Sequence, residues 1–98
     1  MFVHSVYFWL RDGIKDSELR QFTSQLQALT TIPTVKVSYV GVPAATDRPV
    51  IDSSYSYGMI LVFDDRSGHD IYQDHEIHDR FRNECSTYWS KVLIYDFE

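Results

Sequence analysis

The chain has 98 residues, 15% of them aromatic, and a formal net charge of −5 at pH 7. This length fits a single domain over residues 1–98, because no tract of proline, glycine or serine divides it. The acidic balance, without a cluster of lysine or arginine, argues against nucleic acid or an anionic membrane surface as a partner.

The chain shows no export or membrane signal. No basic segment precedes the apolar start, and no run of about 18 apolar residues occurs. We therefore expect a soluble, cytoplasmic protein. Cys85 is the only cysteine, which excludes an internal disulfide and is compatible with a reducing compartment. A buried, unreactive thiol is the simplest interpretation of Cys85.

The first predicted elements are a strand and a helix. Residues 2–10, FVHSVYFWL, are rich in β-branched and aromatic side chains on both faces, so we expect both faces to be covered. Leucine and phenylalanine then recur at spacings of three and four over residues 19–29, which predicts an amphipathic helix. Asp16 or Ser17 is expected to cap its start, and Pro33 limits its end.

Two further strands flank a long loop. Residues 34–42 alternate apolar and polar side chains, and residues 55–63 do the same with larger apolar groups. Residues 43–54 contain two prolines and no regular spacing of apolar side chains, which predicts a loop. Loops of this length are often functional and sometimes merely mobile.

The last third of the chain predicts two short helices and a strand. Asp65 or Ser67 can cap a helix that runs through Tyr72. A second helical period covers residues 76–86, and the apolar run at residues 90–97 predicts the last strand.

The element order is β-α-β-β-α-β, which predicts an α+β protein of the ferredoxin-like class with a four-stranded antiparallel sheet. Its helices cover one face of the sheet. The other face remains apolar, and a second copy of the chain is the simplest way to bury it. We therefore expect a homodimer formed through the face that carries Val3, Tyr7, Trp9, Ile60 and Val62.

Two groups of titratable side chains are candidates for a site. His4 shares a strand face with apolar residues, where a lone histidine is more often a hydrogen-bonded core residue than a catalytic one. Tyr72, His75 and His78 recur every three residues along one side of a helix. By spacing alone, a solvated helix face is favoured for these three, because charged residues lie between them.

A metal site is the weaker interpretation of the same segment. It would use His75 and His78 with Asp74 or Asp79. Metal-binding histidines on a helix are usually four residues apart, and no second pair supplies the missing ligands. We therefore expect no metal and treat any bound ion as adventitious.

The catalytic motifs of other enzyme classes do not occur. The sequence has no G-x-S-x-G, P-loop, G-x-G-x-x-G or C-x-x-C. The residues that remain are histidine and tyrosine. A histidine titrates near neutral pH and a tyrosine can hydrogen-bond an enolate oxygen, so the pair suits proton transfer next to a carbonyl.

Four segments carry a resemblance to a known family. They are FVHSVYF at the start, IPTVK before the second strand, the Y-x-x-H-x-x-H-x-x-F pattern of residues 72–81, and YWSKVLIYDFE at the end. In this order and spacing the chain resembles the stress-responsive A/B barrel domain family, also called dimeric α/β barrel proteins. The resemblance implies a ferredoxin-like protomer, a barrel at the dimer core, and a cleft between each sheet and its helices.

The resemblance also implies a possible activity. Plant members include a cofactor-independent polyketide cyclase that closes a poly-β-keto chain by aldol condensation. Its pattern maps onto His4, Tyr72 and His78, with His78 as general base and Tyr72 as hydrogen-bond donor. The small-molecule ligand would be held by residues implied to line the cleft, which are Tyr57, His75, Phe81, Trp89 and Ile94.

Two departures from the family pattern bear on the site. Glu76 stands where the family commonly has proline, and Tyr57 stands where the cyclase has a pocket histidine. Three functions therefore stay open: a cofactor-free lyase or cyclase, a non-catalytic stress-response module that binds a ligand, and a cofactor-free monooxygenase.

Overall fold

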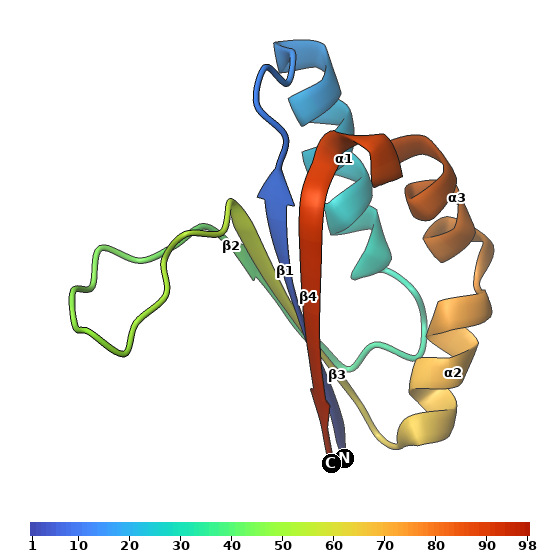
Figure 1. The fold of residues 1–98 in the computed structure, drawn as a ribbon. Helices are drawn as coiled ribbons and strands as arrows, with labels where there is room; N and C mark the ends of the chain where they lie inside the picture. Colours follow the sequence, from blue (N-terminus) through green and yellow to red (C-terminus); the bar gives the residue numbers. More distant parts are fainter.

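The computed structural model describes all 98 residues and shows one antiparallel sheet with helices on one side (Figure 1). The strand order is β2-β3-β1-β4. The strands are β1 (Phe2–Leu10), β2 (Val37–Gly41), β3 (Tyr57–Phe63) and β4 (Trp89–Phe97). The predicted ferredoxin-like βαββαβ fold is confirmed, and β1 lies in the middle of the sheet with β3 and β4 as neighbours.

The helices are α1 (Asp16–Leu29), α2 (Arg66–Asp74) and α3 (Glu76–Cys85), followed by a 3-10 turn at Ser86–Tyr88. The expected cap of α1 is wrong. Lys15, not Asp16 or Ser17, is the N-cap residue, and the Glu18 carboxylate accepts a hydrogen bond from its backbone N–H. The Glu18 carboxylate caps the free backbone N–H of Lys15 and is held over the first turn by its hydrogen bonds with Arg11.

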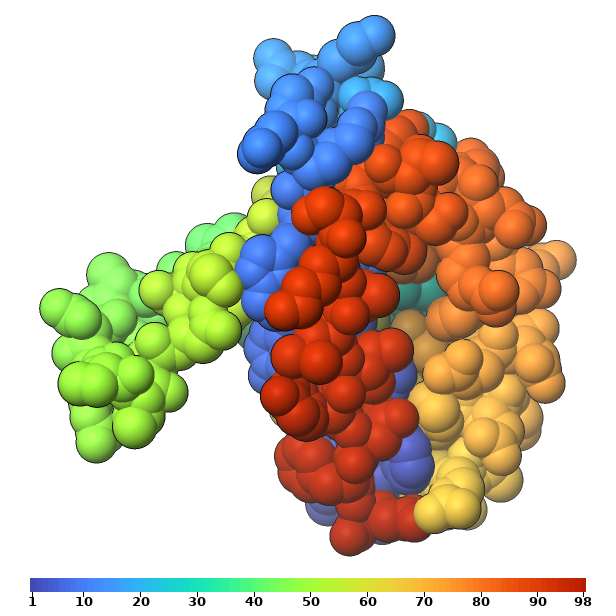
Figure 2. All heavy atoms as spheres, viewed as in Figure 1, coloured from blue at the N-terminus to red at the C-terminus, as the bar shows by residue number.

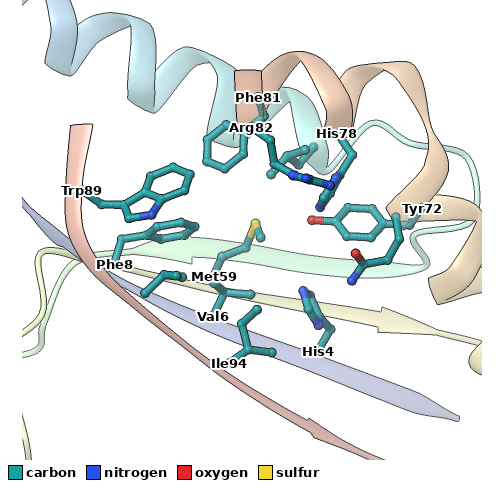
Figure 3. A pocket seen from close by; sticks show the side chains of 13 residues that line it. His4, Val6, Phe8, Met59, Tyr72, His78, Phe81, Arg82, Trp89 and Ile94 are labelled. Carbon is teal, nitrogen blue, oxygen red and sulfur yellow. The ribbon is translucent and has the colours of Figure 1, made fainter. Parts of the chain in front are cut away.

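A break at His75 separates α2 from α3. Its backbone is extended, with φ −70° and ψ 144°, and its Nδ1 accepts a hydrogen bond from the N–H of Ile77. Tyr72, His75 and His78 therefore do not lie along one continuous helix face, as the spacing suggested. The break turns α3 relative to α2. Tyr72 and His78, each three residues from His75, therefore meet above the sheet (Figure 3).

The core lies between the sheet and the helices. Phe22, Leu26 and Leu29 of α1 are fully or almost fully buried against the strand residues Phe8 and Leu61. These α1 residues share one helix face, as the spacings of three and four predicted. A cavity lies beside this core, under α2 and α3.

The other face of the sheet is open and apolar. The side chains of Val37, Tyr39, Ile60, Tyr95 and Phe97 on this face are exposed, with Tyr39 at 72% and Ile60 at 38%. Contiguous apolar surface of this kind is rare on monomeric proteins.

The connection between β2 and β3 projects away from the body as an extended arm (Figures 1 and 2). It includes the predicted loop at residues 43–54, which contains no helix or strand. None of the helices has the length and apolar character needed to cross a membrane.

Candidate functional site

A cavity of about 310 Å³ lies between the sheet and the helices. The surface is hollowed between β4 and the pair α2 and α3 (Figure 2), and the side chains that meet there are shown in Figure 3. The lining residues are His4, Val6, Phe8, Leu29, Met59, Tyr72, Gln73, His78, Phe81, Arg82, Trp89, Val92 and Ile94. Most of the wall is apolar, and the polar groups gather at one end, around Tyr72.

His4 forms the floor at the polar end. It is only 3% exposed, and its Nδ1 lies 2.5 Å from a carboxylate oxygen of Asp96, its partner in the β1–β4 register. Burial lowers the pKa of His4, and the hydrogen bond that His4 donates to Asp96 opposes that effect. A neutral His4 donates from Nδ1 to Asp96, so its Nε2 is left as a hydrogen-bond acceptor.

His78 lies across the cavity on the first turn of α3. Its Nδ1 is buried and has no hydrogen-bond partner in the protein. Burial lowers the pKa of His78, and the positive charge of Arg82 lowers it further. At neutral pH His78 is therefore an uncharged imidazole that can accept a proton.

Tyr72 lies between the two histidines. Its ring centre is 4.9 Å from that of His78 and 5.7 Å from that of His4, and its hydroxyl points into the cavity (Figure 3). The residue is 1% exposed, and burial raises the pKa of its hydroxyl well above the usual value. Tyr72 thus stays protonated and can donate one hydrogen bond to a ligand oxygen.

Two of the expected lining residues lie elsewhere. His75 caps α3 through its Nδ1 and does not border the cavity. Tyr57 does not line it either, because its ring packs against Phe22 under α1, 5.6 Å between ring centres. The other three expected residues, Phe81, Trp89 and Ile94, do line the cavity. Phe81 stacks on Trp89, 5.4 Å between ring centres, to form the apolar end.

Four polar residues at or beside the cavity were not expected from the sequence. Asp96 is hydrogen-bonded to His4, and the ring of His69 lies 4.8 Å from that of His4, centre to centre. Gln73 and Arg82 line the wall of the cavity. His69 is buried, its Nε2 lies 2.9 Å from the Gln73 amide nitrogen, and it stands three residues before Tyr72. That spacing would have extended the Y-x-x-H pattern backwards by one step.

His4, His69 and Asp96 bring three potential metal ligand atoms within 4.8 Å of one another. Two ligands of one zinc ion bound at 2.0–2.1 Å lie roughly 3.3 Å apart, so an ion would have to separate the His4–Asp96 pair. The short contact between them favours a histidine–carboxylate pair, which orients the imidazole, over a metal centre.

The sequence was compared with models of known protein families. The family model described as Stress responsive A/B Barrel Domain matches residues 2–98. The chain belongs to this family. A comparison with curated proteins found none that matches.

Several solved structures share the fold of this chain. A Dabb family protein from Mesorhizobium loti is 24% identical, with a TM-score of 0.78 over 99% of this chain and 94% of that one. A dimeric ferredoxin-like protein of unknown function from Thermobifida fusca is 21% identical, with a TM-score of 0.78 over 98% and 88%. The hydroxynitrile lyase from Passiflora edulis is 16% identical, with a TM-score of 0.78 over 98% and 90%.

Proposed function

We propose that this A/B barrel domain is a cofactor-independent enzyme of the lyase or cyclase kind. Its cavity binds a small apolar or aromatic carbonyl compound. His78 removes or returns a proton at the carbon next to the carbonyl, and Tyr72 holds the carbonyl oxygen.

The observation that carries this proposal is the pair of unused polar groups in one cavity. The Nδ1 of His78 is buried without a hydrogen-bond partner, and Tyr72, whose ring centre lies 4.9 Å from that of His78, points its hydroxyl into the same cavity (Figure 3). Leaving a buried polar group unsatisfied costs about 1–3 kcal/mol, so such groups are typically kept where a ligand completes them.

The chemistry follows from the two protonation states. The neutral imidazole of His78 takes a proton from carbon, and the electron pair moves onto the carbonyl oxygen to give an enolate. The hydroxyl of Tyr72 donates a hydrogen bond to that oxygen as its charge develops. His4, fixed by Asp96, presents its Nε2 as an acceptor at the opposite side and orients the substrate.

The apolar end of the cavity supports the same assignment. Phe8, Phe81 and Trp89 form an aromatic wall whose ring centres lie 5.1–5.9 Å apart. Such a wall binds an aromatic or branched hydrocarbon and excludes water, which strengthens the hydrogen bond from Tyr72 to the substrate oxygen.

We further propose that the protein is a homodimer through the open sheet face. The exposed apolar residues of that face support this, and relatives with this fold are described as dimeric. An interface of ordinary size would bury about 800 Å² or more on each protomer. The cavity lies on the other face of the sheet, because its strand residues alternate with those of the open face, so each protomer keeps its own site.

The test is exchange of the proton next to a carbonyl for deuterium. A panel of aryl ketones and keto acids is incubated with the protein in deuterated buffer and followed by NMR. We expect catalysed exchange for some members, reduced about 10²- to 10⁴-fold by His78→Gln. Tyr72→Phe is expected to reduce it about 10²- to 10³-fold through the lost oxygen contact.

His75→Asn is the matched control. It removes an imidazole close to the site in sequence but outside the cavity, and asparagine keeps the capping ability of His75. Its exchange rate should equal that of the wild type. Ligand binding without exchange by any panel member would instead identify a binding module, and oxygen consumption during turnover would identify a monooxygenase.

A further inference from the structure

One permanent charge borders the cavity, on a side chain that is also exposed to solvent. Arg82 is the only Lys, Arg, Asp or Glu among its 13 lining residues. It stands one turn after His78 on α3, so the two side chains project from the same face of the helix (Figure 3). The positive charge therefore lies next to the proposed base.

No acidic side chain neutralises this arginine. Arg11, Arg66 and Arg80 form ion pairs with glutamates. Arg82 forms none and, unlike the other unpaired arginines Arg20 and Arg48, lines the cavity. Arg80, two residues earlier on the same helix, binds Glu84 at 2.8 Å. Arg80 thus provides a neighbouring arginine whose charge is already satisfied by the protein.

We propose that the cavity takes a substrate with a carboxylate group and that Arg82 binds this carboxylate. The inference rests on the cavity being the substrate site of the proposed function and adds the chemical class of the ligand. The substrate is then a small aromatic or branched keto acid, with its carbonyl oxygen at Tyr72 and its hydrocarbon part against Trp89.

A carboxylate is the anion that fits this arrangement. The planar guanidinium donates two parallel hydrogen bonds to a carboxylate, and a single arginine is sufficient for that pairing. Phosphate sites generally add further basic groups or a helix N-terminus, and Arg82 lies instead in the last turn of α3. The volume of about 310 Å³ suits a ligand with one aromatic ring.

The charge also has a chemical consequence for the reaction. An enolate is an anion, and a cation beside it lowers the energy of its formation. Burial lowers the pKa of His78, and the same cation adds to that effect, so the imidazole is neutral before the proton is transferred, which is the state that a base requires. Arg82 is thus placed to select the substrate and to favour its deprotonation.

The experiment compares acids with their uncharged amides by titration calorimetry. The probes are benzoate, phenylacetate and 3-phenylpropanoate, each paired with its carboxamide of nearly equal size. For the chain length that fits best, we expect the wild-type protein to bind the acid about 10- to 100-fold more tightly than the amide.

The Arg82→Gln variant should lose this preference and bind acid and amide alike, while Arg82→Lys keeps part of it through its charge. Arg80→Gln is the matched control and should behave as the wild type, because Arg80 does not line the cavity. Wild-type protein that binds neither member of any pair, or both equally, overturns the proposal. An unchanged preference in Arg82→Gln overturns it as well.

The result is separable from the proton-transfer proposal. Loss of the acid preference in Arg82→Gln, with no exchange activity in any protein, would keep the carboxylate site and reject the enzyme. Exchange that depends on His78 but shows no preference for acids would keep the enzyme and reject the carboxylate site.

Discussion

Replacing Ile60 with lysine tests the proposed dimer at the centre of the open sheet face. Ile60 lies on β3, and its register partners are Ser5 on β1 and Tyr39 on β2. Its side chain points away from the helices and is 38% exposed in the single chain. A charged side chain at this position should disrupt pairing without reaching the core or the cavity.

The expected magnitude follows from the exposed fraction. Complete burial of an isoleucine contributes about 1.5–3 kcal/mol, so the exposed 38% is worth about 0.6–1.1 kcal/mol in each protomer. Two-fold symmetry doubles this to about 1–2 kcal/mol. Two like charges brought together add several kcal/mol, so the dimer Kd should rise about a thousandfold or more.

The assay is analytical ultracentrifugation over a range of protein concentrations. Ile60→Lys should sediment as a monomer where the wild type is a dimer. Ile71→Lys is the control, since Ile71 is 55% exposed on α2, which lies on the helix side of the sheet. An Ile60→Lys variant that remains dimeric, or a monomeric wild type, refutes the reasoning.

Three further outcomes are expected. The free energy of unfolding should fall as the pH drops from about 7 to about 5.5. Folding lowers the pKa of His4 and His78 below 6.5, so the unfolded chain binds more protons than the folded one in this range. A urea midpoint that does not change between these pH values would contradict this. Phe22→Ala should cost about 3–5 kcal/mol of unfolding free energy, against almost none for the exposed Gln27→Ala, in chemical denaturation. Zinc added and then challenged with a chelator should leave less than one equivalent bound and no change in Tm; a stoichiometric, stabilising ion at His4, His69 and Asp96 would show that the expectation of no metal is wrong.

The sequence alone determined the elements and their order. Alternation in residues 34–42 and 55–63 and period 3.6 in residues 19–29 are local properties, since they reflect which side of a strand or helix meets the core. For the same reason the strand faces were predictable, and His4 was expected on a strand face with apolar residues. The boundaries shifted by a few residues at β2 and β3, where the ends depend on pairing with neighbouring strands.

Only the tertiary structure decided which polar residues meet. Asp96 reaches His4 because antiparallel register joins β1 to β4 across 92 residues of sequence, and no local pattern encodes that register. The break at His75 removes this residue from the site and turns His78 toward Tyr72, because its extended backbone redirects the chain between two helices. Arg82 could be predicted only as a helical arginine, because its place in the cavity depends on how α3 packs over a sheet built from distant segments.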